Sequence, residues 1–511
     1  MFYLRPLAAV VLMSASATTF SQVTLESEPN SMEEVIVAGQ FLYTDTVNAL
    51  KTPTPILDVP QSLSLMSAAD IRERGFNSIG EVIAYMPGVT SSQGEGHRDA
   101  VVFRGVRSTA DFYIDGMRDD VQYYRPLYNL EQVEVLRGPN ALLFGRGGTG
   151  GVLNRVTKKA VVDDAFTQAQ MSIDSFGEVG GQIDHNVSLS DTTAFRVNAM
   201  VEELDNHRDF YEGDRRGFNP TLRIEAGDSK VDLSYEYVDH QRFIDRGIPT
   251  GANGRPVEAL EDVVFGDPKV NTTELEAHLW RAALQHTFSD TLKLNVSAFY
   301  GDYDKLYQNF YASGYDQEAA PDEVTLDGYV DTTQRKNTIL SVNIVKEARL
   351  GNVGHTILSG VESISTSSDQ DRYNTFWDTT QDDNETFSIS RNLGIRGGVG
   401  VNVLGLITTN DFGVDVNDHT EVEIDVTSFY IQDEMELSEA FRLVAGLRYD
   451  SFDINVLNRV AEDSRSSKDS EVSPRFGVVY KPQENISIYA SYSESFLPRS
   501  GEQFANINGN N

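Results

Sequence analysis

Hydrophobic and polar residues alternate with a period of two along most of the chain after about residue 165. One such segment places Phe195, Val197, Ala199 and Val201 on one face. The same alternation recurs at 231–237, 292–300 and 486–493. Because successive side chains of a strand point to opposite faces, this pattern predicts β-strands. We expect about 13 strands between Ala165 and Ser493.

The connections between these segments are of two kinds, tight polar turns and long acidic loops. Turns are expected at 190–193, 227–229, 289–290, 438–439 and 482–485, and long loops at 239–273, 302–333 and 365–423. Short turns at one end and long loops at the other are typical of an outer-membrane β-barrel. A soluble β-sandwich uses the same alternation and is the alternative, although it rarely needs several such loops on one side.

The N-terminus, from Met1 to about Ser21, has the layout of a cleaved signal peptide. Arg5 precedes an apolar stretch from Leu7 to Met13, and small residues follow at 14–17. This stretch is too short to span a bilayer as a helix, which takes about 20 apolar residues. The alternative is a disordered N-terminus. We assign residues 1–21 to a signal peptide.

Charge and cysteine content exclude several classes of function. The chain has a net charge of −35 and no cysteine. Nucleic-acid binding needs a basic face that replaces phosphate counterions, so it is disfavoured. Without cysteine there is no disulfide, thiolate metal site or cysteine nucleophile. Most of the negative charge lies after residue 160, whereas the first 160 residues are nearly neutral.

The run from Val133 to Lys159 joins two strand-like segments through glycine-rich turns. It is not a nucleotide-binding loop, because no Lys-Ser or Lys-Thr follows its last glycine and strand-like residues follow instead of a helix. Three short motifs, the last of them within this run, occur in a fixed order. They are Phe103-Arg104-Gly105, Tyr113-Ile114-Asp115-Gly116 and Glu134-Val135-Leu136-Arg137-Gly138-Pro139, with Gly145-Arg146-Gly147-Gly148 behind the last.

This ordered set closely resembles the plug domain of TonB-dependent outer-membrane receptors, among them most of all the ferric-siderophore importers. The resemblance implies an all-β membrane barrel of the 22-stranded type with an N-terminal α+β plug inside its lumen. We place the plug at 41–160 and the barrel at 161–511. By comparison with the family, the barrel looks C-terminally truncated by about nine strands, and a genuinely smaller barrel is the alternative.

The segment 32–40 resembles the TonB box that the energy-transducing partner grips. The resemblance implies that Glu34, Val35, Ile36 and Val37 bind TonB of the TonB–ExbB–ExbD complex. An extended Val-Ile-Val run can add as a strand to the edge of a partner's sheet. The alternative is an ordinary first strand of the plug.

Ligand contacts are expected in two plug loops that, by resemblance, face outward: Ser91 to Arg98 and Arg118 to Tyr128. Guanidinium groups and aromatic faces pack well against the flat, anionic rings of a ferric siderophore. The candidate ligand-binding residues are Arg98, Tyr123, Tyr124 and Arg125. The alternative is that these tyrosines only wedge the plug in the barrel.

The remaining plug motif residues are expected to have structural roles. Arg104, Arg137 and Arg146 would pair with barrel carboxylates, and Gly138, Gly147 and Gly148 would permit turns. The histidines form no spaced cluster of metal ligands, so we predict neither a protein metal site nor a resident cofactor, since iron would arrive with its siderophore. No catalytic arrangement stands out, and we predict no enzyme activity.

The function implied is TonB-dependent import of a ferric siderophore across the outer membrane of a Gram-negative bacterium. The partners would be the siderophore, the TonB complex, and the lipid and lipopolysaccharide around the barrel. The alternative is a receptor for another bulky nutrient such as haem, cobalamin or an oligosaccharide. A passive porin would lack the plug motifs.

Overall fold

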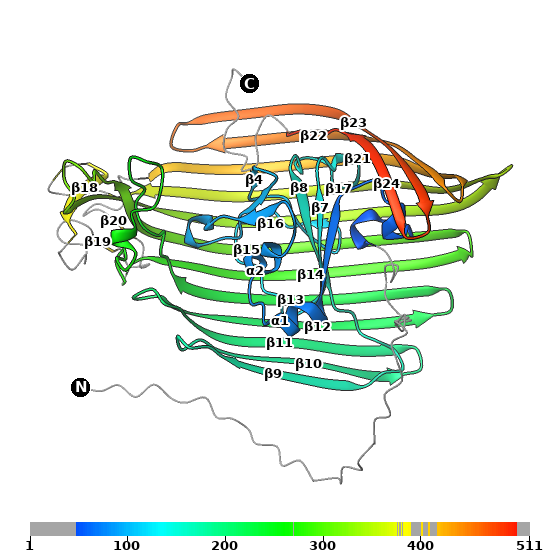
Figure 1. Cartoon of the computed structure of the whole chain (residues 1–511), viewed down its shortest axis with the longest axis horizontal. Helices are drawn as coiled ribbons and strands as arrows, with labels where there is room; N and C mark the ends of the chain where they lie inside the picture. Colours follow the sequence, from blue (N-terminus) through cyan, green and yellow to red (C-terminus); the bar gives the residue numbers. More distant parts are fainter. Residues whose placement is uncertain are drawn as a thin grey trace, which may run out of the picture. The chain divides into compact units, whose positions relative to one another are not determined.

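The computed structural model describes residues 47–497 apart from 269, 376, 378–379, 381, 390–399, 402–406 and 409–415. The expected signal peptide and TonB box-like segment lie outside the described residues. Two sheet systems follow one another along the chain: small sheets formed by residues up to Thr157, and one large sheet that starts at Phe166. Figure 1 shows both.

The N-terminal part, which we call the plug, contains a five-stranded sheet in the order β1-β7-β8-β5-β6 and a three-stranded sheet β2-β3-β4. Only the β5–β8 pair among these strands is parallel. The strands are β1 Leu63–Ser67, β2 Val89–Ser91, β3 Val101–Phe103, β4 Val106–Ser108, β5 Phe112–Ile114, β6 Met117–Arg118, β7 Leu130–Arg137 and β8 Gly151–Thr157.

Short helices connect these strands. The α-helices are α1 Ala68–Arg74, α2 Ile79–Ala84 and α3 Ala141–Phe144, and the 3-10 helices are η1 Asn48–Leu50, η2 Ile56–Asp58 and η3 Gly94–Gly96. Capping boxes begin two of them, Ser67 with Asp70 at α1 and Ser78 with Glu81 at α2, so each serine satisfies a free backbone N–H. Helix α2 ends at Ala84, shortly before Pro87-Gly88, a pair typical of a turn.

The helices pack on the five-stranded sheet through an apolar core. Ile79, Val82 and Ile83 of α2 contact the cluster that contains Val133 and Val135 of β7, and each is at most 1% exposed. Removing such side chains from water is the main favourable term in folding. The plug therefore has a core of its own, separate from the large sheet.

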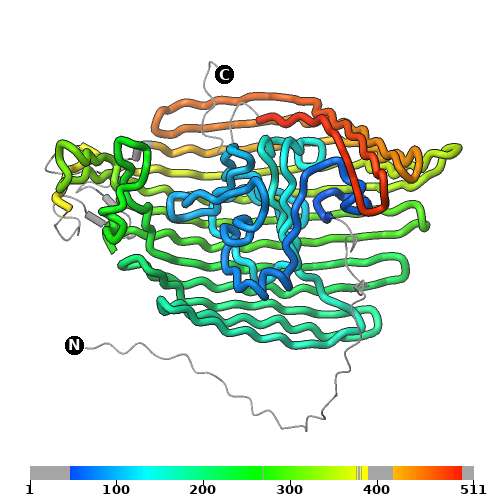
Figure 2. Tube along the Cα trace, in the orientation of Figure 1, coloured from blue at the N-terminus to red at the C-terminus, as the bar shows by residue number. Residues whose placement is uncertain are grey.

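The large sheet is an antiparallel meander in which each strand pairs with the strand before it and the strand after it along the path (Figures 1 and 2). Its path runs through β9 Phe166–Ile173, β10 Val179–Ser190, β11 Thr193–Asp205, β12 Glu212–Ala226, β13 Ser229–Phe243, β14 Thr272–Ser289, β15 Leu292–Gly314, β16 Glu323–Leu350, β17 Val353–Asn374, β21 Val416–Ser438, β22 Phe441–Asn458, β23 Asp463–Gln483 and β24 Ile486–Ser493.

Three further strands and one helix lie in the long connections. β18 Asn384–Ser388 pairs with β16, β19 Gly400–Val401 pairs with β20 Ile407–Thr408, and η4 Glu258–Leu260 follows β13. Among the described residues, the sheet has 14 strands, of which only β18 is off the path, so thirteen form the meander. About 13 were expected from the alternation, and this prediction is confirmed. In the described residues, β9 and β24 are the end strands and do not pair with each other.

The large sheet has polar side chains on its covered face and apolar side chains on its exposed face, which is the reverse of the distribution in a soluble protein. The face that covers the plug is polar, with Arg223 and Asn198 at most 1% exposed. The other face exposes large apolar side chains, such as Leu233 at 44% and Phe429 at 52%. Transmembrane barrel strands show this arrangement, with polar residues toward the lumen and apolar residues toward lipid. No helix among the described residues is long and apolar enough to cross a bilayer.

Two of the three expected long loops are shorter than predicted. β15 continues to Gly314 and β16 begins at Glu323, so most of 302–333 is strand. β17 likewise continues to Asn374. The outward-facing residues here, such as Asp304 and Asp369, are polar and exposed. Where a strand is polar on both faces, the alternation that reveals it is lost.

Candidate functional site

The plug reaches the long-connection end of the large sheet through the loop between β2 and β3. Glu95 in this loop binds Arg98 of the plug at 2.5 Å and Arg246, in the connection after β13, at 3.3 Å. Hydrogen bonding from His97 and the charges of both arginines hold the pKa of the Glu95 carboxyl well below its usual range. The loop between β2 and β3 is therefore ion-paired to the connection that follows β13.

Aromatic rings from neighbouring strands surround these arginines. The Arg246 guanidinium lies 4.0 Å from the ring centre of Tyr311 in β15 and 5.9 Å from that of Tyr329 in β16. Arg372 of β17 lies 4.4 Å from the Tyr329 ring and binds Asp331 through two hydrogen bonds of 2.6 and 2.7 Å. Each guanidinium is thus held over a ring face, where it retains donors for an anion.

Arg242 and Tyr124 form another pair of a guanidinium and a phenol ring in this region. The Arg242 guanidinium, at the end of β13, lies 3.5 Å from the ring centre of Tyr124. The Tyr124 hydroxyl donates to the Gln93 carbonyl at 3.1 Å, and burial raises the pKa of Tyr124 to about 12. We call the whole set the mouth cluster: Glu95, Arg98, Tyr124, Arg242, Arg246, Tyr311, Tyr329 and Arg372.

Of the four ligand-binding residues predicted from the sequence, the structure places Arg98 and Tyr124 in the mouth cluster. Tyr123 and Arg125 lie elsewhere, each only 1% exposed. Both bind Asp119, the tyrosine through its hydroxyl at 2.8 Å and the arginine through Nε at 3.1 Å. These two side chains are buried at the junction of plug and sheet, outside the mouth cluster.

Asp119 is the centre of this buried junction. It is 0% exposed and also accepts from Arg155 at 2.5 Å and from the Tyr303 hydroxyl of β15 at 2.9 Å. Buried charges are tolerated only when they are paired and hydrogen-bonded, and here one carboxylate faces two guanidiniums and two phenols. The junction therefore fixes the plug to the sheet through charged hydrogen bonds.

Among the described residues, the contacts of two of the three motif arginines lie mainly within the plug. Arg146 binds Asp120 of the plug itself at 3.0 Å, and Arg335 of β16 binds the same carboxylate at 3.4 Å. Arg137 donates to the Ser64 hydroxyl at 2.7 Å. Arg104 is exposed. The described contacts of Arg146 and Arg137 are thus with Asp120 and Ser64 of the plug.

The motif glycines have the backbone geometry expected of turns. Gly138, Gly147 and Gly148 have φ values of 88°, 80° and 63°. These values lie in the left-handed region, which glycine adopts without steric cost. The Gly148 N–H donates to the buried Asp111 carboxylate at 2.7 Å, so the turn also satisfies a buried charge.

Glu134 of β7 binds the backbone of the segment at η1, where the described residues begin. Its carboxylate accepts the backbone N–H groups of Asn48 at 2.6 Å and Ala49 at 2.9 Å, and the Asn154 amide at 2.8 Å. Burial raises the pKa of this carboxyl to about 7. The segment at η1 is thus held to the plug core by one side chain.

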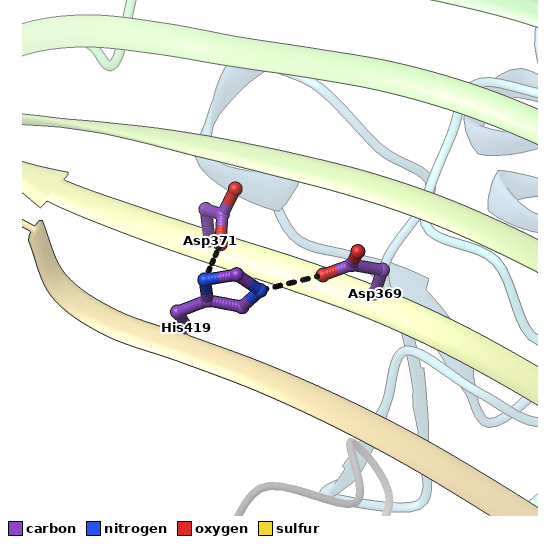
Figure 3. A group of neighbouring side chains, drawn as sticks. All are labelled: Asp369, Asp371 and His419. Atoms are coloured by element: carbon purple, nitrogen blue, oxygen red, sulfur yellow. Dashed lines mark ion pairs between the residues drawn. The ribbon is translucent and has the colours of Figure 1, made fainter. Parts of the chain in front are cut away.

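One group among the described residues has the composition of a metal site. The ligand-type atoms of Asp369, Asp371 and His419 lie within 4.8 Å of one another, on the outward side of β17 and β21. Figure 3 shows that the two ring nitrogens face different carboxylates, Nδ1 toward Asp371 at 3.6 Å and Nε2 toward Asp369 at 3.5 Å. One imidazole offers only one nitrogen to a single ion. This geometry fits an ion-paired imidazole, and we assign no metal to it.

The residues of the mouth cluster outside the plug were missed by the sequence analysis. Arg242, Arg246, Tyr311, Tyr329 and Arg372 belong to no motif. The available signal was local, since each of these residues lies near the end of a strand or in a long connection. Only the pairing of distant strands brings them together.

Comparisons with known proteins agree with this architecture. Residues 217–511 match the family model described as TonB dependent receptor-like, beta-barrel, and residues 55–152 match that of the TonB-dependent receptor plug domain. The first match alone covers more than half of the chain. The chain therefore belongs to the TonB-dependent receptors, a family of outer-membrane receptors and transporters.

Individual relatives are distant. The chain is 24% identical to the probable TonB-dependent receptor BfrD of Bordetella pertussis, over 98% of this chain and 68% of that protein. The crystal structure of the siderophore receptor PiuA from Acinetobacter baumannii superposes with a TM-score of 0.78 at 23% identity, covering 92% of this chain and 70% of that one. The crystal structure of the ferric-catecholate import receptor Fiu from E. coli K12, in its open form, superposes with a TM-score of 0.75 at 21% identity. This match covers 89% of this chain and 72% of that one. The expected fold, a plug with a large β-barrel sheet, is confirmed.

Proposed function

We propose that this receptor imports an anionic ferric siderophore across the outer membrane of a Gram-negative bacterium. The observation that carries the proposal is the mouth cluster, in which guanidinium groups lie over phenol rings beside the plug. A ferric siderophore presents negative charge and often flat chelating rings, and both find partners there. The relatives PiuA and Fiu, described as siderophore and ferric-catecholate receptors, support the same class of ligand.

Energy for import would come from the TonB–ExbB–ExbD complex through Glu34, Val35, Ile36 and Val37. The plug fills the polar side of the sheet and is fixed there by the Asp119 junction, so passive flow is not the expected mode. Outer-membrane lipid and lipopolysaccharide would surround the apolar face. Iron would be cargo carried by its chelator, and the protein would need no catalytic group.

The test is uptake of labelled ferric siderophores by cells that carry this receptor and lack their own. Arg246→Ala removes a guanidinium that faces Glu95 and Tyr311, and we expect it to weaken binding about tenfold, as for the loss of one charged hydrogen bond. Arg255→Ala, an exposed arginine of the same connection outside the mouth cluster, is the matched control. Equal affinity in both variants would refute this site. Preference for haem, cobalamin or an oligosaccharide over every siderophore would favour the alternative ligands.

A further inference from the structure

Glu95 has a backbone conformation that glutamate rarely adopts. Its φ is 55°, between Gly94 at 64° and Gly96 at 77°. Glycine enters this left-handed region freely, whereas a residue with a Cβ pays a steric cost. Non-glycine residues persist there only when surrounding contacts hold them. The contacts that hold Glu95 therefore determine the conformation of the whole loop.

The side-chain contacts of Glu95 are ionic and partly exposed, and one further contact is made by its backbone carbonyl. The Glu95 carboxylate binds Arg98 at 2.5 Å and Arg246 at 3.3 Å, and its carbonyl accepts from the Tyr307 hydroxyl at 3.1 Å. The Glu95 side chain is 38% exposed, whereas Arg98 and Arg246 are 14% and 18% exposed. The carboxylate is thus the outermost member of the trio. An incoming anion meets Glu95 before it can reach either guanidinium.

A carboxylate that covers two guanidiniums competes with any other anion for them. Charged hydrogen bonds are stronger than neutral ones, but a polydentate anion can replace both of these at once. The ion pairs that Glu95 makes are partly solvated, so their exchange for a ligand's oxygens leaves the released carboxylate free to enter water. Loss of these pairs also removes the side-chain contacts that hold Glu95 in the left-handed region.

We propose that the Glu95 carboxylate occupies the place of the ligand's anionic donors in the free receptor, so that an anionic chelate displaces it from Arg98 and Arg246 and releases the loop Gly94–Gly96. This inference rests on the proposed function and adds to it a selectivity rule. Chelates with several negative charges can displace Glu95, and uncharged chelates cannot. Binding of the ligand would also change the conformation of the plug, because the released loop leads through residues 97–100 into β3.

The test compares two probes on the full chain in detergent: the anionic iron(III) complex of a hexadentate tris-catecholate and the uncharged iron(III) complex of a tris-hydroxamate. Glu95→Gln removes the competing charge and keeps the shape. Glu95→Gly removes the charge and also the steric cost of the left-handed conformation. It therefore replaces Glu95→Gln in the test if that variant folds poorly. Glu258→Gln, an exposed glutamate of the connection after β13, makes the same charge change away from the site.

We expect both Glu95 variants to bind the anionic complex about tenfold more tightly than the wild type, with affinity for the uncharged complex changed less than about twofold. Amide hydrogen exchange at 93–97 should be faster in ligand-free Glu95→Gln than in the wild type, and unchanged in Glu258→Gln. Equal or weaker binding of the anionic complex by the Glu95 variants, or unchanged exchange, overturns the displacement. If the wild type binds neither complex, the proposed function fails and the displacement fails with it.

Discussion

Removal of the charge of Asp119 tests whether buried ion pairs fix the plug to the sheet. Asp119→Asn keeps the side-chain volume, so no cavity forms. It leaves Arg125 and Arg155, whose side chains are 0% and 1% exposed, without their shared carboxylate. Breaking a buried pair in this way costs about 3–5 kcal/mol, because an uncompensated charge stays buried.

Two structural details decide where in that range the cost falls. Arg125 retains Asp99 at 3.5 Å and three backbone carbonyls, so its charge remains partly compensated. Arg155 retains the Tyr123 hydroxyl at 3.2 Å, which is a weaker partner than a carboxylate. We therefore expect the lower half of the range, about 3–4 kcal/mol, arising mainly from Arg155.

The assay is calorimetry of the receptor in detergent, combined with amide exchange of β5 and β8. A loss of this size should lower the unfolding temperature of the plug by about 10 °C or more. Asp304→Asn, an exposed aspartate next to Tyr303, is the control and should change stability by less than about 0.5 kcal/mol. A loss below about 1 kcal/mol for Asp119→Asn would show that solvent or relaxation compensates the arginines, and the reasoning would be wrong.

Three other predictions concern the plug core, the N-terminal segment and the apolar face. Burial raises the pKa of Glu134 from 4.5 to about 7, so its contribution to stability is present below pH 4.5 and is lost as the pH rises through 7. Denaturation midpoints of Glu134→Gln should consequently fall less between pH 5 and pH 8 than those of the wild type, and an equal fall contradicts the shift. Ile36→Pro removes a backbone donor needed for strand addition and should abolish iron uptake while ligand binding persists; normal uptake excludes the TonB box assignment. Leu340→Arg places a charge on the apolar face at a cost of about 2–4 kcal/mol, measurable as reduced folding into vesicles relative to Lys336→Arg, and equal folding of the two would argue against a lipid-facing surface.

The strands and the plug could be predicted because both depend on local patterns. Alternation with a period of two reports which face of a strand is apolar, and it revealed β11 and β24 without knowledge of their partners. The ends of β15 and β17 were missed because their outward side chains become polar.

The candidate site was only partly predictable because a strand-like loop does not reveal which side faces the ligand. Tyr123 and Tyr124 are adjacent, and adjacent side chains of an extended chain point to opposite sides. Only Tyr124 faces the mouth, whereas Tyr123 lies against Asp119. Arg246 and Tyr329 could not be found at all, since they reach Glu95 through the folding of segments more than a hundred residues away.

The position of β1 has a mechanical consequence. It is an edge strand, paired only with β7 in the five-stranded sheet, and the chain ahead of it is held by the hydrogen bonds of Glu134 to Asn48 and Ala49. Tension applied ahead of residue 48 loads those bonds first. It reaches β1 only after the bonds of Thr52 and Thr54 to Glu434 and the ion pairs of Asp58 with Lys481 and Arg442 have also broken. Since an edge strand can leave without disturbing the strands beyond its neighbour, the plug would extend in small steps, each at low force, while β8, β5 and the Asp119 junction remain in place.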